Sequence, residues 1–317
     1  MINIDEMRKS FKQKDSIVEK LMKSEGVYCL IAEPKIGKSL LALQLANSIA
    51  TGTTFLGFKT IQSPVLYIST EMDKDEVFSR INKMNCGFNT KNFMFIDQRN
   101  RESRLTLREL ELDFKKFAED LKGKFLIVDM LMGVGINSEI KLNDYQSVSQ
   151  ELFYTYRQLS NKYGFTFFLV HHTNKNGTTL GSTAIDGSCD GKINLTFPKN
   201  ITHKINLEYT SRAYQCFNLV VQRNEHLILE VCEIEVADLD PILITLLNHC
   251  IKRKEFDSIL SDVTSSLNLQ IEPSNLGKLL TQYKEILNKE GLIFKQNRNS
   301  DKRLYHFKYD EPIMEND

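Results

Sequence analysis

The sequence predicts an α/β fold with a mostly parallel sheet, beginning near residue 26. Two observations lead to this prediction: short apolar runs alternate with helical patterns up to about residue 170, and the runs are apolar on both faces. Strands that are buried on both faces belong to a parallel sheet with helices on each side. The predicted strands are 27–32, 65–69, 93–96, 125–129 and 166–170, with helices over 38–50, 74–84, 106–121 and 144–163.

The pattern changes after Gly191. Short strands are predicted over 193–197, 204–209, 216–221 and 227–234, separated by turn residues such as Pro198-Lys199-Asn200. They indicate an antiparallel extension of the sheet. A break at 238–241 precedes a second, helical unit. We therefore expect an N-terminal arm (1–25), a main domain (26–236), a small C-terminal domain (241–309) and an acidic tail (310–317).

Composition and charge exclude several classes of protein. Lys+Arg and Asp+Glu both number 41, so no net charge attracts the whole chain to nucleic acid or to an anionic membrane. No apolar run approaches the roughly 20 residues of a membrane helix. The N-terminal 23 residues are charged throughout and do not resemble a secretory signal. Six cysteines without a CxxC pair indicate reduced thiols. We expect a cytoplasmic protein without membrane contact.

The stretch "AEPKIGKS", residues 32–39, matches a phosphate-binding loop except that Ala32 replaces its first glycine. It follows a predicted strand and opens a predicted helix, so backbone N–H groups and the helix N-terminus would face a phosphate. Ala32 falls at the strand end, where an extended conformation does not require glycine, whereas Gly37 does carry such a requirement. Lys38 is expected to reach the outer phosphates of ATP or GTP, and Ser39 to bind Mg²⁺. The predicted nucleotide-binding residues of the loop are Ala32, Glu33, Pro34, Lys35, Ile36, Gly37, Lys38, Ser39 and Leu40.

Two carboxylates end neighbouring predicted strands. Asp129 closes "FLIVD" and is the candidate second Mg²⁺ residue that a phosphate-binding loop needs. Glu71 in "LYISTEM" follows the strand 65–69, at the edge where ligands of open α/β sheets bind. We interpret Glu71 as the general base that prepares water for hydrolysis.

Two adjacent histidines, His171 and His172, end the strand "FTFFLV". A zinc site is disfavoured because adjacent strand residues point to opposite faces and no third ligand is near. Contact of one histidine with the terminal phosphate is favoured, with the other packing in the core.

Taken together, these residues resemble the RecA-like ATPases, and in particular the hexameric replicative helicases of plasmids and phages (the RepA type and the related DnaB-like group). The resemblance covers about residues 26–236 and is carried by "AEPKIGKSLLALQLA", "VLYISTEM", "FLIVD", "VHHTNK" and "LGSTAIDGSCD". It implies a RecA-like core that binds ATP and Mg²⁺ through Lys38, Ser39 and Asp129. It also implies activation of water by Glu71 and sensing of the γ-phosphate by His171 or His172.

The resemblance also implies a homo-oligomeric ring, with six subunits in this family, in which an arginine of one subunit reaches the ATP of its neighbour. Arg212, in "NLEYTSRAY", is the candidate for this arginine, although an ordinary exposed strand-end arginine is an equal alternative. Two residues depart from the family pattern: Leu180 stands where an arginine is common, and Thr210 where a helper lysine is common.

By the same resemblance, two loops would line a central channel that holds single-stranded DNA. They are residues 132–143 and 175–183, and their only cations are Lys141 and Lys175. Neither loop has an aromatic side chain, so stacking on bases would be weak. Six copies of each loop would compensate by avidity.

The C-terminal unit reads as three helices (242–252, 256–266 and 273–288) followed by a hairpin, which is a winged helix. Ser274 is the predicted cap of the third helix. The span 241–308 holds eleven Lys/Arg against seven Asp/Glu. This excess favours duplex DNA, with the third helix in the major groove, over a protein-docking role. The predicted hairpin contacts are Lys295, Arg298, Lys302 and Arg303.

We therefore expect an ATPase of a plasmid, phage or mobile element that acts in DNA replication as a helicase or helicase-like factor. The alternative is a DNA-binding regulator or accessory factor that ATP switches and that unwinds nothing. A small-molecule kinase is disfavoured because the HHTNK and LGS elements would have no role in it. Residues Phe11, Ile17, Val18 and Leu21 also allow a short amphipathic helix that docks on a neighbouring subunit.

Overall fold

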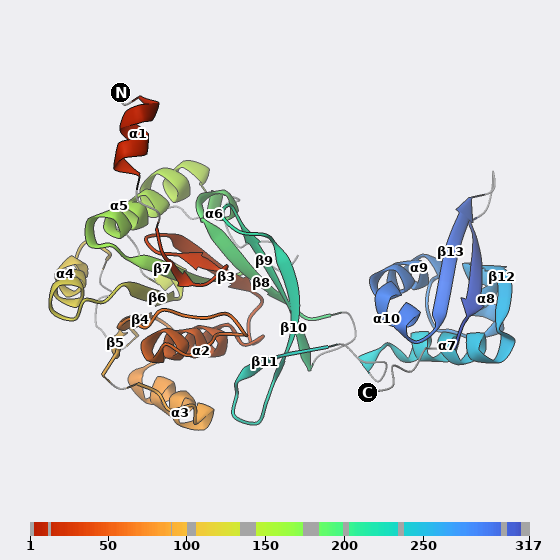
Figure 1. The fold of residues 1–317 in the computed structure, drawn as a ribbon. Coiled ribbons are helices and arrows are strands. Elements are labelled where there is room, and N and C mark those ends of the chain that lie inside the picture. Colours follow the sequence, from red (N-terminus) through yellow and green to blue (C-terminus); the bar gives the residue numbers. More distant parts are fainter. Residues whose placement is uncertain are drawn as a thin grey trace. The chain divides into compact units, whose positions relative to one another are not determined.

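The computed structural model describes residues 3–11, 14–89, 91–99, 106–133, 144–173, 184–198, 203–233, 238–298 and 303–311. The chain divides into two compact units (Figure 1). The first contains Met1–Phe197 and His203–Cys232, and the second contains Glu233–Asp317. Among the described residues, no helix combines the length and the apolar character that crossing a membrane requires.

A single large sheet forms the centre of the first unit, and it confirms the predicted α/β class. Within the described residues it has nine strands in the order β11-β10-β9-β8-β3-β7-β6-β4-β5. The strands from β8 to β5 pair in parallel, and β9, β10 and β11 pair antiparallel. The bounds are β3 Val27–Ala32, β4 Val65–Ser69, β5 Phe93–Asp97, β6 Phe125–Asp129, β7 Thr166–His172, β8 Gly191–Thr196, β9 Lys204–Ser211, β10 Phe217–Arg223 and β11 Leu229–Cys232.

The strand β8 differs from the prediction, because it belongs to the parallel part of the sheet. Tyr28 pairs with Gly191, so β8 starts at the same edge as β3 and runs beside it. The chain returns to this edge through the connection that contains α6 (Ala184–Ser188), and such a crossover is what parallel pairing needs. Burial alternates along β8, which is why its sequence resembles a half-buried antiparallel strand. Only β9 to β11 form the antiparallel extension.

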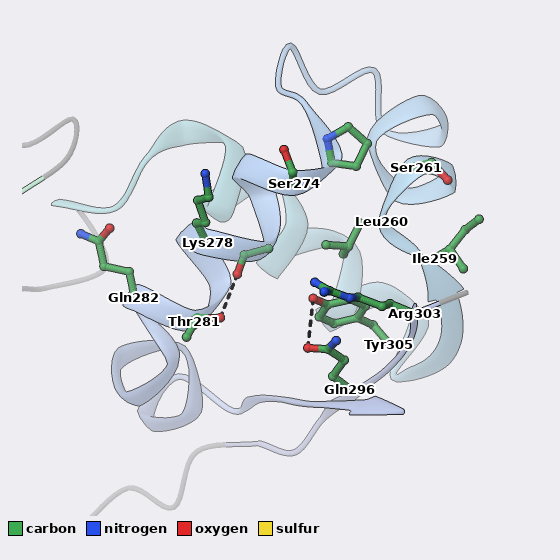
Figure 2. A pocket seen from close by; sticks show the side chains of 12 residues that line it. Ile259, Leu260, Ser261, Ser274, Lys278, Thr281, Gln282, Gln296, Arg303 and Tyr305 are labelled. Carbon is green, nitrogen blue, oxygen red and sulfur yellow. Dashed lines mark hydrogen bonds between the residues drawn. The ribbon is translucent and has the colours of Figure 1, made fainter. Parts of the chain in front are cut away.

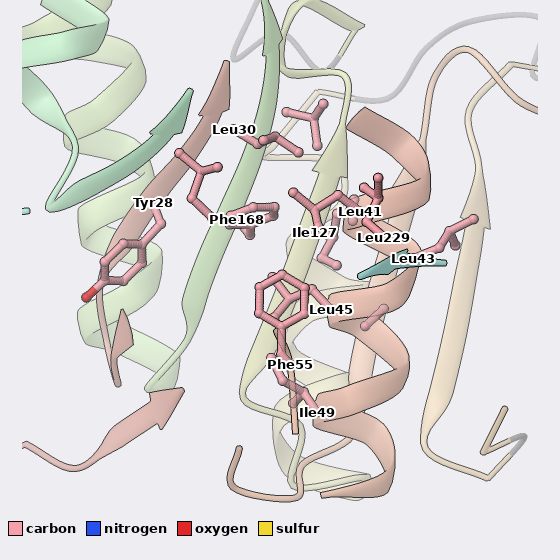
Figure 3. Packing of buried hydrophobic residues seen from close by; sticks show 14 of the residues in the cluster. Tyr28, Leu30, Leu41, Leu43, Leu45, Ile49, Phe55, Ile127, Phe168 and Leu229 are labelled. Carbon is pink, nitrogen blue, oxygen red and sulfur yellow. The ribbon is translucent and has the colours of Figure 1, made fainter. Parts of the chain in front are cut away.

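Helices cover both faces of the sheet, each over its own apolar cluster. One face carries α2 (Lys38–Thr51) and α3 (Lys74–Met84), and Figure 3 shows Leu41, Leu45 and Ile49 of α2 packed toward the sheet. The other face carries α4 (Glu111–Asp120), the π-helical turn Ser147–Leu152 and α5 (Phe153–Tyr163). A short 3-10 turn, Leu131–Gly133, follows β6.

The N-terminal segment differs from the predicted amphipathic helix. Ile17 and Leu21 are buried in the core of the first unit, where Ser16–Val18 (β1) and Met22–Lys23 (β2) form a small hairpin. The prediction fails because the turn at Lys20 has a positive φ of 57°, which ends any helix there. A separate helix, α1 (Ile4–Ser10), precedes this hairpin and begins with a capping box.

The second unit packs helices against a small antiparallel sheet. In its described part, the strands lie in the order β12-β14-β13 around one apolar core. That core includes fully buried Leu246, Leu280 and Phe307. The elements are α7 Pro241–Arg253, β12 Glu255–Ile259, α8 Leu260–Ser266, α9 Pro273–Gln282, α10 Lys284–Lys289, β13 Leu292–Arg298 and β14 Arg303–Tyr309.

Three local predictions for this unit are wrong. The predicted helix 256–266 begins as a strand, β12, because residues 255–259 pair with β14. The predicted helix 273–288 is broken at Tyr283 into α9 and α10. Ser274 does not cap α9: Glu272 is its N-cap residue and Pro273 occupies the first turn, where its fixed φ replaces a side-chain cap.

Candidate functional site

The carboxyl ends of four neighbouring parallel strands meet at one edge of the sheet. Ala32 at the end of β3 pairs with His172 of β7, and Ser69 at the end of β4 pairs with Asp129 of β6. Such an edge is where open α/β sheets bind ligands. A cavity of about 600 Å³ lies there. Its lining consists of Pro34, Lys35, Gly37, Lys38, Ser39, Leu40, Glu71, Arg80, Met130, His172, Arg223 and Leu227.

The backbone explains how the loop tolerates Ala32. Ala32 is the last residue of β3, is buried, and accepts a hydrogen bond from the Thr173 N–H at 3.1 Å. It is therefore extended, as predicted, and needs no glycine. Gly37 is the N-cap residue of α2 with φ 118°. A Cβ there would meet no atom within 4 Å, so the requirement for glycine comes from the conformation and not from space.

Lys38 lies over the loop with its ammonium group at the cavity. Its Nζ donates to the carbonyl oxygens of Ala32 at 3.0 Å and Glu33 at 2.6 Å. Burial lowers the pKa of Lys38, and the carboxylates of Asp129, Glu71 and Glu33 oppose that shift. Ile36 does not face the cavity, because its side chain is buried in the core. Glu33 is exposed, and among the described residues it is not part of the cavity lining.

Asp129 lies beneath this lysine and is 1 % exposed. Its Oδ2 accepts a hydrogen bond from the Tyr67 hydroxyl at 2.5 Å, and its Oδ1 has no hydrogen-bond partner among the described residues. Burial raises the pKa of Asp129, while the hydroxyl groups of Tyr67 and Ser39 lower it. A buried carboxylate oxygen without a partner, beside a hydroxyl, fits the oxygen ligands that Mg²⁺ prefers. Ser39 and Asp129 are thus the residues that would hold the ion.

Glu71 is held at the cavity by a fixed turn. The Ser69 hydroxyl donates to the Met72 carbonyl at 2.7 Å and accepts from the Met72 N–H at 3.1 Å. Asp73 then caps α3 through a capping box with Glu76. The Glu71 carboxylate projects into the cavity, and its Oε1 lies 3.5 Å from Nε2 of His172.

The two histidines separate, as alternation along a strand requires. His172 lines the cavity opposite Glu71. His171 is fully buried, pairs in register with Ile31 and faces the other layer, so it does not belong to the cavity lining. Of the two histidines predicted to contact the terminal phosphate, His172 lines the cavity and His171 does not.

Sequence reasoning missed Arg80, Arg223 and Leu227, which also line the cavity. Arg80 comes from α3, and its positive charge lowers the pKa of Asp129. Arg223 and Leu227 come from the hairpin that joins β10 to β11. The Gln44 side chain of α2 holds this hairpin, because it donates to the Leu229 carbonyl at 2.9 Å and accepts from the Leu229 N–H at 3.0 Å. No motif marks such a long-range contact.

Arg212 lies at the opposite edge of the sheet. It follows β9 directly, and its backbone N–H donates to Asp190 at 3.1 Å, beside the start of β8. Its guanidinium donates to the Gly187 carbonyl and lines a separate cavity with Arg157 and Asp190. The six residues of β3 span roughly 20 Å, so Arg212 cannot reach the nucleotide site of its own chain.

The predicted DNA contacts are only partly described. Arg303 and Lys295 are exposed on the hairpin of the second unit, but on opposite faces. Arg303 shares a face of β14 with buried Tyr305, two residues on, whereas Lys295 pairs in register with His306, which lies on the other face. Lys141, Lys175, Leu180, Lys302 and the side chain of Arg298 lie outside the described residues.

A doubly covered parallel sheet with a Gly-Lys-Ser loop, a buried strand-end aspartate and a cavity lined by lysine and arginine side chains defines a P-loop ATPase. The family comparison agrees: residues 2–178 match the model of the AAA domain family. The match covers more than half of the chain and includes the loop, Glu71, Asp129 and His172. The chain belongs to this family. The comparison with curated proteins gives no match.

The loop geometry yields a paired prediction. We expect Ala32→Gly to leave ATP affinity unchanged and to lower the free energy of unfolding by about 0.5 to 1 kcal/mol, because glycine in a strand loses more chain entropy. Gly37→Ala should weaken ATP binding, because the alanine disfavours φ 118° by about 1 to 3 kcal/mol. Calorimetric titration and urea unfolding measure both effects. Tighter binding by the Ala32→Gly variant would contradict this account of the loop.

Proposed function

We propose that this protein is an ATP-hydrolysing DNA motor. It would be a helicase or helicase-like ring ATPase that acts on DNA in the replication of a plasmid, phage or mobile element. The observation that carries the proposal is the contact of Glu71 with His172 across the nucleotide cavity. A carboxylate beside the phosphates supports hydrolysis. His172 continues into the segment expected to meet single-stranded DNA, so it would link the state of the phosphate to that segment.

Each residue then has a distinct role. Lys38 neutralises charge on the outer phosphates, and Glu71 accepts a proton from the attacking water. Mg²⁺, held by Ser39 and Asp129, would supply further charge neutralisation on the phosphates. His172 lies where it can hydrogen-bond the terminal phosphate and Glu71 in turn. Lys35, Arg80 and Arg223 add further cations of the same chain at this cavity.

The Glu71→Gln variant tests the motor. We expect ATP to bind normally and turnover to fall about 10²- to 10⁴-fold, since the amide cannot accept the proton. Strand displacement on a forked substrate should disappear with turnover. Lys38→Ala is the binding control, because it should lose ATP affinity itself. If wild-type protein hydrolyses ATP and protects DNA without displacing a strand, the ATP-switched regulator is the better description.

We also propose that the protein works as a ring in which Arg212 acts on the ATP of a neighbouring subunit. Arg212 lies at the edge of the sheet opposite the nucleotide cavity, which supports action on a neighbouring subunit. Arg223, by contrast, lines the nucleotide cavity of its own chain. Six subunits are expected from the resemblance, and the mass with and without ATP and single-stranded DNA measures this.

Mixing variants separates the two arginines. Arg212→Ala should bind ATP but lose turnover by about 10³-fold or more. When it is mixed with Glu71→Gln, turnover should return, because Arg212→Ala sites keep their base and receive the missing arginine from the neighbour. The matched control is Arg223→Ala with Glu71→Gln, which leaves no complete site and should stay inactive. Absence of recovery in the Arg212 mixture, with mixed rings present, would contradict action between subunits.

We further propose that the second unit is a winged helix that binds duplex DNA. Figure 2 shows a groove between α8, α9 and the β13–β14 hairpin, of about 770 Å³. Lys278 of α9 and Arg303 of β14 line it with polar Ser274, Gln282 and Gln296, and no described lining residue is acidic. Two cations among amide and hydroxyl groups suit phosphates and base edges.

Charge substitutions test this groove. Lys278→Ala and Arg303→Ala should each weaken duplex binding and reduce the salt slope by about 1, because each removes one phosphate contact. Lys295→Ala removes the same charge from the other face of the hairpin and should have a smaller effect. Fluorescence anisotropy at several salt concentrations measures all three. Equal losses for Lys295 and Arg303 would contradict the groove, and unchanged binding in all three would favour a protein partner.

A further inference from the structure

Tyr67 connects the apolar core to the candidate metal residue. Across the β4–β6 pair, Tyr67 lies opposite Ile127, and Ser69 lies opposite Asp129. The phenol therefore extends two residues along the strand, roughly 7 Å, to reach the carboxylate. Its hydroxyl donates to Asp129 Oδ2 at 2.5 Å. Both side chains are buried, with exposed fractions of 0 % and 1 %.

The ring of Tyr67 is fixed by its neighbours. It packs against Phe93 and Phe95 of β5, with ring centroids 6.0 and 6.3 Å away, in the cluster between the sheet and α2. Phenylalanine would fill this place equally well. The hydroxyl adds nothing to that packing, and burying it without a partner would be unfavourable. Its described hydrogen bond goes to Asp129, so this contact supplies the partner that the buried hydroxyl needs.

One consequence concerns the two oxygens of Asp129. The bond to Tyr67 engages Oδ2 and restricts rotation of the carboxylate. The other oxygen, Oδ1, is then the one that has no described hydrogen-bond partner. A ligand oxygen that is oriented in advance binds a cation more tightly than one that can rotate, because a hydrogen-bonded partner behind the ligand fixes its direction.

We propose that Tyr67 is a positioning residue that orients Asp129 for the divalent cation of the bound nucleotide. It touches neither nucleotide nor cation and acts through Asp129 alone. The inference rests on the proposed ATP chemistry, to which it adds a residue that determines how tightly the cation is held. The segment "VLYIS" gives no sign of this role, since the tyrosine reads as one more apolar strand residue.

The test separates cation binding from nucleotide binding. ADP affinity is measured by calorimetry in EDTA, and Mn²⁺ affinity of the protein–ADP complex by electron paramagnetic resonance. For Tyr67→Phe we expect unchanged ADP affinity in EDTA and Mn²⁺ affinity lowered about 10-fold, the scale of losses behind metal ligands. ATP turnover should recover at high Mg²⁺. A role in packing alone would instead lower ADP affinity or stability and leave Mn²⁺ affinity unchanged.

Two comparisons make the result specific. Tyr156→Phe removes another fully buried hydroxyl, which lies in the opposite layer and has no described hydrogen-bond partner, and should change neither affinity. In an Asp129→Asn background, Tyr67→Phe should cause no further loss of Mn²⁺ affinity, since the two residues act as one unit. Additive losses would overturn the proposal. If Tyr67→Phe does not fold, Tyr67→Met provides the same loss of the hydroxyl with an adaptable side chain.

The experiment also distinguishes this inference from the proposed function. If the wild-type protein binds neither ADP nor Mn²⁺ with ADP, the ATPase proposal itself fails. If the wild type binds both and Tyr67→Phe binds Mn²⁺ equally well, the ATPase proposal stands and the role of Tyr67 is refuted.

Discussion

Parallel pairing among β3, β7, β6 and β4 determines where every chemical group of the nucleotide site lies. The pairs Ala32 with His172 and Ser69 with Asp129 set the four strand ends at one level. Side chains alternate along a strand, so a slip of one residue would turn Asp129 and His172 to the wrong face. The apolar residues of these strands oppose such a slip, because they are buried in clusters on both faces. The core therefore fixes the register, and the register fixes the site.

Much of this edge could be predicted from sequence. The strands that carry Ala32, Ser69 and Asp129 were predicted at their observed bounds, because continuous apolar runs end at polar residues there. The phosphate loop could be predicted because Gly37 and Lys38 follow such a run. The extended conformation of Ala32 followed from the same position. Local pattern is sufficient where the function lies in a loop between a strand and the next helix.

The rest depends on contacts that no local pattern encodes. Arg223 reaches the cavity only because a hairpin 185 positions away from Gln44 folds over α2. The sequence of β12 predicts helix, whereas the segment forms a strand because its edge pairing with β14 joins segments about 50 residues apart. Ile17 and Leu21 have helical spacing, yet they enter the core from a tight hairpin. In each case tertiary packing overrides the preference of the segment.

The hydrogen bonds between Gln44 and Leu229 have a consequence for how this protein can evolve. They need one group that donates and one that accepts at the tip of a single side chain, and a primary amide provides both. Ionised glutamate offers only acceptors and lysine only donors, so either substitution would lose one of the two hydrogen bonds to Leu229. Few residues can therefore replace Gln44, although it does not line the cavity. A substitution there would loosen the β10–β11 hairpin, which contributes Arg223 and Leu227 to the cavity lining.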